Sequence, residues 1–282
     1  MPFYISFDSA DVWSNPALFR IDEKGAITGM AGVPPDYFSK TGQLWGMPVY
    51  NWDKLKATNY DWWVKRIKRN LDFFDIIRLD HFRAFAAYWE VPAGSKDATT
   101  GKWKPGPGAD FFGHIRNELG ALPFVAEDLG DIDDAVYNLR DEFGLPGMRV
   151  LQFAFDEAMA VSEYAPHNYI ENTVAYTGTH DNNTVAGWFK SDADNAVKKR
   201  LKNYYGGKIT AKNISDIMIR MCYGSVAKTA IIPLQDILSL GANSRMNVPS
   251  VAKGNWEWMV DGKMLSPKIE KKLKNLTICY NR

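Results

Sequence analysis

Three carboxylates, each shortly after an apolar run, are the residues of this sequence best suited to chemistry. Asp80 follows IIRL, Glu127 follows FVA, and Asp181 lies in TGTHDNNT after the run TVAY. Carboxylates without a metal-ligand cluster are typical of glycoside chemistry, in which one is a nucleophile and another donates a proton to the leaving oxygen. Retaining enzymes hold these two carboxyl groups about 5–5.5 Å apart, which is the separation we expect between Asp80 and Glu127.

Arg78 and Asp80 are two residues apart, so their side chains lie on the same side of an extended strand. A guanidinium fixed beside a carboxylate keeps that carboxylate ionised and oriented, as attack on an acetal carbon requires. A structural ion pair buried at a strand end has the same sequence signature. The segment RLDHFR is compatible with both interpretations.

Two further segments place polar residues after apolar runs. Glu127 and Asp128 are either a pair of acids at a helix start or a general acid with a supporting neighbour. His180 and Asp181 lie between an apolar strand and a helix, where polar groups are unfavourable unless they are used. We interpret these two residues as hydrogen-bonding groups for a ligand.

The composition excludes several other classes of protein. Lys+Arg 34 against Asp+Glu 33 leaves a net charge of +1, so we expect no nucleic-acid and no membrane partner. The two cysteines match no disulfide framework and no zinc spacing, which favours a cytoplasmic location. Neither a Gly-rich phosphate turn nor a nucleophile elbow occurs. Aromatic side chains in loops suit sugar rings, and the tryptophans so placed are Trp13, Trp45, Trp52, Trp103, Trp188, Trp256 and Trp258.

Short apolar runs alternate with helical patterns, which predicts an α/β fold with a parallel sheet. The predicted strands are 3–6, 75–79, 123–126, 148–154, 173–177 and 229–234, and the predicted helices are 60–73, 109–119, 132–143, 191–204 and 210–222. We expect Asp131 and Thr210 to be N-caps. Residues 7–58 form a strand-poor stretch that is too long for an ordinary connection, which indicates a functional segment.

Acidic residues at the carboxyl ends of buried strands are typical of the active site of a (β/α)₈ barrel. A doubly wound sheet would need a Gly-rich phosphate turn instead. Since six predicted strands are two short of eight, we expect a partial (β/α)₈ TIM barrel.

The sequence resembles the amylomaltase or disproportionating-enzyme family of 4-α-glucanotransferases, glycoside hydrolase family 77. In family order, the matching stretches are DSADVWSNPALF, AGVPPDYFSKTGQLWGMPVYNWD, IIRLDHFRAF, FVAEDLG, LPGMRVLQFAF, TGTHDNNT and SRMNVPSVAKGNWEW. They cover nearly the whole chain, and as a set they are highly specific. The resemblance implies transfer of α-1,4-glucan segments by a retaining double displacement, without a cofactor or a metal.

The resemblance also assigns roles to individual residues. Asp80 would be the nucleophile, Glu127 the acid/base, and Asp181 the residue that holds the 2- and 3-hydroxyls of the sugar at the cleavage point. The substrate-binding residues that it implies are Arg78, His180, Asp36, Tyr37, Trp45, Asp8 and Asn247. Arg78 would orient Asp80. From its residues, the segment 36–50 is a candidate lid, in which Trp45 either offers a stacking face to the acceptor or packs the loop onto the barrel.

In this family the first segment of the chain corresponds to the third barrel strand. We therefore expect strands three to eight, with the first two βα units missing, in a single catalytic barrel domain over 1–282. Residues 7–58 would be an active-site loop insertion within it. A separate N-terminal chain that complements the missing units is a candidate partner.

Three functions are compatible with these residues. The favoured one is a 4-α-glucanotransferase that takes a maltooligosaccharide or α-1,4-glucan donor and a sugar acceptor. An α-amylase-like hydrolase is the alternative among enzymes, and the resemblance of the segment around Tyr37 and Trp45 favours transfer over it. The third is a non-catalytic remnant that binds glucan weakly at most.

Overall fold

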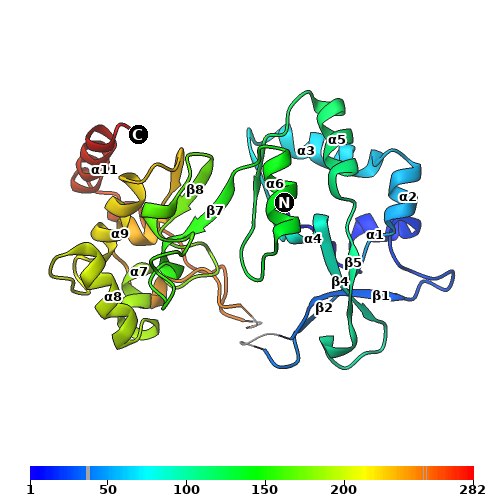
Figure 1. Ribbon diagram of the computed structural model, residues 1–282, viewed down its shortest axis with the longest axis horizontal. Helices are drawn as coiled ribbons and strands as arrows, with labels where there is room; N and C mark the ends of the chain where they lie inside the picture. Colours follow the sequence, from blue (N-terminus) through cyan, green and yellow to red (C-terminus); the bar gives the residue numbers. More distant parts are fainter. Residues whose placement is uncertain (36–38, 250, 252) are drawn as a thin grey trace. The chain divides into compact units, whose positions relative to one another are not determined.

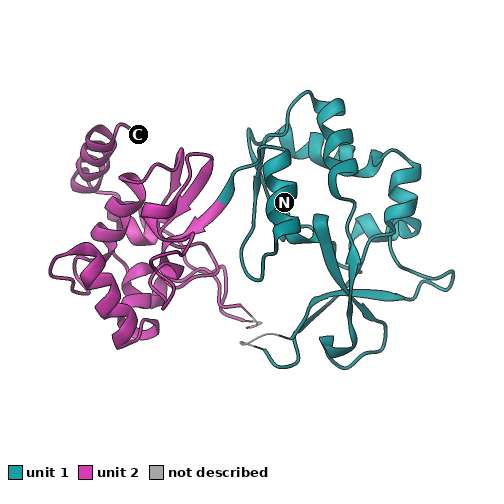
Figure 2. Cartoon of the chain, in the orientation of Figure 1, with its two compact units in different colours: residues 1–147 teal, residues 148–282 magenta. Residues whose placement is uncertain are grey.

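The chain folds into two compact units, Met1–Gly147 (unit 1) and Met148–Arg282 (unit 2), which Figure 2 colours separately. The structure, a computed structural model, describes residues 1–35, 39–249, 251 and 253–282. Among these residues, no helix is both long and apolar enough to cross a bilayer.

Unit 1 contains an antiparallel sheet, a pair of parallel strands and several helices (Figure 1). Its strands are β1 (Gly29–Val33), β2 (Gln43–Pro48), β3 (Ile77–Leu79), β4 (Ala87–Pro92), β5 (Lys102–Pro105) and β6 (Phe124–Ala126). Its helices are α1 (Ala10–Ser14), α2 (Trp52–Ala57), α3 (Asp61–Leu71), α4 (Arg83–Ala86), α5 (Gly108–Leu119) and α6 (Asp134–Glu142), with short 3₁₀ turns η1 (Pro16–Leu18) and η2 (Ala98–Thr100). Strands β3 and β6 are parallel neighbours, with Ile77 opposite Phe124 and Leu79 opposite Ala126.

The predicted helix over 60–73 is confirmed as α3, and its apolar stripe explains its position. Trp63 and Ile67, one turn apart, are almost completely buried, while Lys65 points to solvent and pairs with Asp61 one turn earlier. The predicted helices over 109–119 and 132–143 are confirmed as α5 and α6, but the expected N-cap of α6 is wrong. Asp133, and not Asp131, accepts the backbone N–H of Val136.

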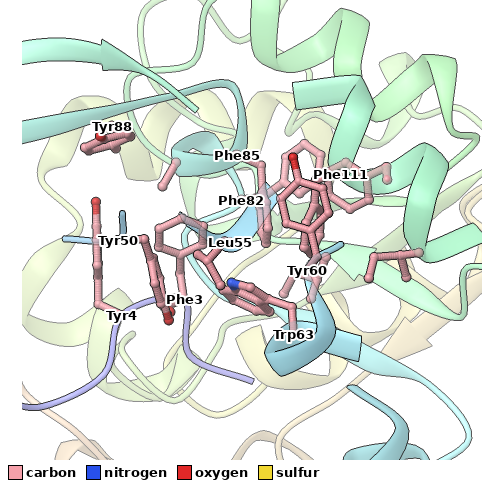
Figure 3. Close-up of a cluster of buried hydrophobic side chains, with 14 of the residues drawn as sticks. Phe3, Tyr4, Tyr50, Leu55, Tyr60, Trp63, Phe82, Phe85, Tyr88 and Phe111 are labelled. Atoms are coloured by element: carbon pink, nitrogen blue, oxygen red, sulfur yellow. The ribbon is translucent and has the colours of Figure 1, made fainter. Parts of the chain in front are cut away.

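Most aromatic residues of unit 1 form its hydrophobic core (Figure 3). Phe3 lies edge-on to Phe85, with ring centroids 4.7 Å apart, and its carbonyl oxygen accepts a 2.6 Å hydrogen bond from the Tyr50 hydroxyl. Trp63 and Phe111 close the same cluster, with ring centroids 5.5 Å apart. Edge-to-face aromatic pairs add about 0.5–1.5 kcal/mol each to the free energy of burial, so this cluster fixes the elements around β3.

The predicted strand over 3–6 is wrong. No strand forms over these residues. Phe3, Tyr4 and Ile5 are all buried, as are the residues of β6 and β8, so this apolar run gave the same signal as a strand buried on both faces. Met1 lies beside β3: its amine donates to the Arg78 carbonyl at 2.6 Å, and its carbonyl accepts from the Asp80 N–H at 3.0 Å.

The description of residues 7–58 as strand-poor is also wrong, since this stretch supplies two strands of the antiparallel sheet β2-β1-β4-β5. The partner of β1 on its second side is β4, with Gly29 opposite Pro92, about sixty residues later in the chain. Gly32 is needed for the close approach, because a Cβ there would lie 2.5 Å from the Gln43 carbonyl oxygen. Strands rich in glycine that pair over such a distance give little local signal.

Unit 2 is built on the sheet β7-β8-β9 and the helices around it (Figure 1). The strands are β7 (Gly147–Val150), β8 (Thr173–Tyr176) and β9 (Thr229–Ile231). The helices are α7 (Val185–Gly187), α8 (Asn195–Tyr205), α9 (Ile214–Tyr223), α10 (Leu234–Ile237) and α11 (Pro267–Tyr280), with the π turn η5 (Trp188–Asp192) and the 3₁₀ turns η3 (Leu151–Phe153), η4 (Pro166–Asn168), η6 (Ala242–Ser244) and η7 (Gly262–Met264). Strands β8 and β9 are parallel, with Val174 opposite Thr229.

The sequence predicted the three strands of unit 2 and the helices α8 and α9, but not all of their ends, and it did not predict α7 and α10. The strand predicted over 148–154 turns into η3 after Val150, and the strand predicted over 229–234 ends at Ile231. Asn213, and not Thr210, precedes α9, and the Asn213 side chain accepts the Thr210 N–H at 2.7 Å. The alternation of strands and helices confirms an α/β fold, and the two parallel pairs, β3 with β6 and β8 with β9, agree with the predicted parallel arrangement.

Candidate active site

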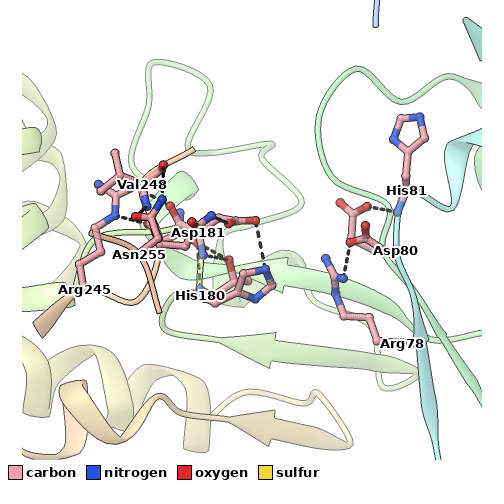
Figure 4. Close-up of polar contacts among 12 residues, drawn as sticks. Arg78, Asp80, His81, His180, Asp181, Arg245, Val248 and Asn255 are labelled. Carbon is pink, nitrogen blue, oxygen red and sulfur yellow. Dashed lines mark hydrogen bonds and ion pairs between the residues drawn. The ribbon is translucent and has the colours of Figure 1, made fainter. Parts of the chain in front are cut away.

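Asp80 lies directly after β3 beside Arg78, as the spacing predicted (Figure 4). An Arg78 Nη1 donates to Asp80 Oδ1 at 2.5 Å. The side chains are 27% and 45% exposed, so the interpretation as a buried structural pair does not fit this geometry. The arrangement instead presents an oriented carboxylate that a ligand can reach.

Glu127 follows β6, the parallel neighbour of β3, and its carboxyl is held by backbone donors. The His81 N–H donates to Glu127 Oε2 at 2.7 Å, and the Leu129 N–H donates to Oε1 at 3.3 Å. Burial raises the pKa of Glu127 from 4.5 to about 8; Asp80 adds to this rise, whereas Arg78 and the two N–H donors oppose it. At neutral pH this carboxyl therefore carries a proton, as a general acid must.

His81 is a residue of this site that the sequence reasoning did not single out. Its φ of +51° is in the left-handed region, which is unusual for a residue other than glycine. In this conformation its N–H reaches Glu127, and its ring lies edge-on to Trp45 with centroids 5.0 Å apart. Burial lowers the pKa of the His81 imidazole to about 4, so the ring is neutral at neutral pH. In the sequence, the feature that could have pointed to His81 is its position directly after Asp80, the candidate nucleophile.

Asp128 supports the segment that carries Glu127. It is completely buried and accepts a 2.6 Å hydrogen bond from Arg140 Nη1. The interpretation of Glu127 and Asp128 as helix-start acids is wrong, because α6 begins only at Asp134. A Cβ on Gly147 would lie 2.3 Å from Asp128 Oδ2, so the ion pair requires glycine at this position.

In unit 2, His180 and Asp181 follow β8 in the turn that precedes α7 (Figure 4). Their side chains are 39% and 46% exposed, and His180 Nε2 lies 3.3 Å from Asp181 Oδ2. Asn247 fixes both residues: its Nδ2 donates to Asp181 Oδ1 at 2.6 Å, and its backbone N–H donates to the His180 carbonyl at 3.1 Å. Arg245 Nη2 adds a 2.6 Å bond to the Asp181 carbonyl. The structure thus brings Asn247 to the pair, as the family resemblance implied.

A cavity of about 140 Å³ lies beside His180 and is lined also by Thr179, Arg245 and Asp236, among others. Asp236 is buried and accepts hydrogen bonds from the Thr177 hydroxyl at 2.6 Å and the Val185 N–H at 2.7 Å. Burial raises the pKa of the Asp236 carboxyl. Asp236 therefore ties the end of β8 to the start of α7 and so shapes the turn that carries Asp181.

The remaining predicted residues lie in unit 1. Trp45 is on β2, partly buried, with its Nε1 donating to Gln43 at 3.1 Å. Asp8 is exposed, accepts a hydrogen bond from Ser6, and lines an open cavity of about 620 Å³ together with Trp13. Asp36 and Tyr37 lie outside the described residues.

The residues of unit 1 and unit 2 form two separately described groups. Unit 1 brings together Arg78, Asp80, Glu127 and Trp45, and unit 2 brings together His180, Asp181 and Asn247. The expected separation of the Asp80 and Glu127 carboxyls stays a prediction. Across the described part of the chain, no three His, Cys, Asp or Glu side chains are grouped to hold a metal ion.

Comparison with known proteins supports the chemistry suggested by these carboxylates. Residues 1–264 match the glycoside hydrolase family 77, described as 4-alpha-glucanotransferase. The 4-alpha-glucanotransferase of Synechocystis sp. is 50% identical over 285 residues, which cover 100% of this chain and 56% of that protein. The corresponding protein of Thermus thermophilus is 43% identical over 287 residues, which cover 100% of this chain and 57% of that protein.

A similar relation holds for a solved structure, an amylomaltase from Streptococcus agalactiae in complex with acarbose. It matches with a TM-score of 0.95 at 41% identity, over 100% of this chain and 57% of that chain. The chain thus spans little more than half the length of the relatives that it matches.

Proposed function

The chain belongs to glycoside hydrolase family 77, the 4-alpha-glucanotransferases, and on that premise we propose that it transfers α-1,4-glucan segments from a maltooligosaccharide donor to a sugar acceptor. The observation that carries the proposal is the contrast between two carboxyls at the ends of adjacent parallel strands. Asp80 is accessible and paired with Arg78, whereas burial raises the pKa of Glu127 to about 8. A retaining mechanism needs an accessible, oriented nucleophile beside a carboxyl that can donate a proton.

In the first step, the Asp80 carboxylate attacks C1 of the donor sugar while Glu127 gives its proton to the departing 4-oxygen. The C1–oxygen bond breaks and a covalent glycosyl ester forms on Asp80. In the second step, Glu127, now ionised, takes the proton of the acceptor's 4-hydroxyl. The acceptor oxygen bonds to C1, and Asp80 leaves as a carboxylate.

The other residues hold the sugar or orient the reacting groups. Arg78 holds the Asp80 carboxylate in place by its 2.5 Å hydrogen bond. Asp181, fixed by Asn247, accepts from the hydroxyls of the sugar at the cleavage point, and His180 binds the same sugar. Asp8, Asp36 and Tyr37 contact the glucan, and Trp45 faces the acceptor.

Transfer competes with hydrolysis at the Asp80 ester, because water at about 55 M attacks the same carbon. A positioned acceptor prevails since well-oriented groups reach effective molarities of about 10⁵ M and more. Trp45 is suited to this positioning because its ring is held by His81 and Tyr4, at 5.0 and 5.9 Å. The relatives at 43–50% identity named above are transferases, which favours transfer over α-amylase-like hydrolysis.

We also propose that residues 1–282 act as one catalytic domain of the (β/α)₈ type, with strands three to eight and with 7–58 as an active-site segment. The parallel pairs β3 with β6 and β8 with β9 support this arrangement. A complementing chain that supplies two further βα units is retained as a candidate partner. A cytoplasmic location is likewise retained as a proposal, and fractionation of cells that produce the protein tests it.

Incubation of the chain with maltotriose tests the function. We expect glucose together with oligomers longer than maltotriose, and Asp80→Asn should abolish both products. Asp75→Asn, an exposed acid shortly before β3, is the matched control and should leave both unchanged. Glucose and maltose without longer oligomers would indicate a hydrolase, and the absence of all products would refute catalysis by this chain.

A further inference from the structure

Trp256 is a large aromatic residue of unit 2 whose exposure is not explained by packing. It lies nine residues after Asn247, which fixes His180 and Asp181, and it is 59% exposed. Burial of an indole is strongly favourable because its apolar surface leaves water. An indole held at the surface next to candidate ligand-binding residues is free to contact a ligand.

The backbone of Trp256 is strained as well. Its φ of +63° is in the left-handed region, which a bulky side chain rarely adopts. The surrounding chain enforces this conformation: the Trp256 N–H donates to the Met246 carbonyl at 2.7 Å. The preceding Asn255 side chain accepts from the Val248 N–H at 2.9 Å and donates to the Val251 carbonyl at 2.7 Å (Figure 4). Strain of this kind persists where function needs the geometry.

The strained backbone places the indole against His180. The two ring centroids are 5.3 Å apart, and the planes are inclined by 37°. His180 in turn lies 3.3 Å from Asp181 Oδ2, and Asn247 and Arg245 hold Asp181 by hydrogen bonds. The indole, the imidazole and the carboxylate thus form one fixed, half-exposed surface.

From this arrangement we infer that Trp256 is a glucan-binding residue, whose indole packs against the apolar face of a glucosyl unit while His180 and Asp181 bind its hydroxyl rim. This inference rests on the proposed function and adds to it a contact that is made within unit 2 alone. A pyranose presents an apolar CH face and a polar rim, which matches an aromatic face bordered by a hydrogen-bonding pair.

Trp256→Gly is the informative variant, because glycine adopts a φ of +63° without strain. Binding of maltoheptaose is measured by isothermal titration calorimetry in a Glu127→Gln background, which prevents turnover, and the melting temperature is measured on the same samples. We expect the affinity to fall at least tenfold, about 1.4 kcal/mol, while the melting temperature stays the same or rises. Trp256→Phe should stay within threefold of the parent.

Met259→Ala is the control, since Met259 is 83% exposed, lies three residues further along the chain and has a backbone outside the left-handed region. It should bind maltoheptaose as the parent does. Equal affinity of parent and Trp256→Gly would overturn the inference and leave the proposed function intact. A drop in affinity accompanied by a large drop in melting temperature would make Trp256 a structural residue and would also overturn it. No binding by the parent would refute the proposed function, and the inference with it.

Discussion

Replacement of Glu127 by Gln should remove a specific pH dependence of stability. Burial raises the pKa of Glu127 from 4.5 to about 8. Between these two pH values the folded chain keeps a proton that the unfolded chain has lost. The free energy of unfolding therefore falls as the pH rises through this window, and the contribution of Glu127 is constant outside it.

The size of the effect follows from the width of the window. About 3.5 pH units, at about 1.36 kcal/mol for each, give a decrease of at most about 5 kcal/mol. Glutamine has a similar shape and does not titrate, so Glu127→Gln should lose this decrease. His81 contributes with the opposite sign: burial lowers its pKa from 6.5 to about 4, so its contribution to stability rises with pH up to 6.5. His81 is the same in both proteins, so its contribution cancels in the difference.

Urea denaturation followed by tryptophan fluorescence, at intervals from pH 4 to pH 9, measures this difference. Parent minus Glu127→Gln should decrease from about pH 4.5 to about pH 8 and be constant above that. Glu142→Gln, an exposed residue at the end of α6, is the matched control and should give a flat difference. If the Glu127→Gln difference is equally flat, the carboxyl is ionised at neutral pH and its assignment as the resting general acid is wrong.

Three further outcomes are expected. His81→Val should lower the rate of oligomer formation from maltotriose at least tenfold, because a β-branched residue disfavours a φ of +51°. His81→Asn should retain most of the rate, and equal rates for the two variants would refute a role for the His81 backbone. Gly147→Ala should reduce the free energy of unfolding by about 2–4 kcal/mol in urea titrations, because its Cβ would displace Asp128 from Arg140, and an unchanged midpoint would contradict this. Trp45→Ala should lower oligomer formation much more than glucose release, and a parallel loss of both would assign Trp45 to the donor side or to structure.

The sequence by itself was sufficient for the features that are encoded locally. The spacing of Trp63 and Ile67 predicted α3, and the apolar runs before Asp80 and Glu127 predicted β3 and β6. The spacing of Arg78 and Asp80 predicted the ion pair between them. Each of these depends on residues within a few positions of one another, so helix or strand periodicity reveals it.

The features that only the tertiary structure decided depend on residues far apart in the chain. Strand β1 gave no readable pattern because two of its five residues are glycines and its second partner, β4, begins almost sixty residues later. Asn247 reaches Asp181 across 66 residues, and the exposed, strained position of Trp256 beside His180 arises from the same segment. The protonation of Glu127 is of this kind too: its residue type gives a pKa of 4.5, and only burial beside β3 raises it to about 8, since desolvation depends on what the fold places around the carboxyl.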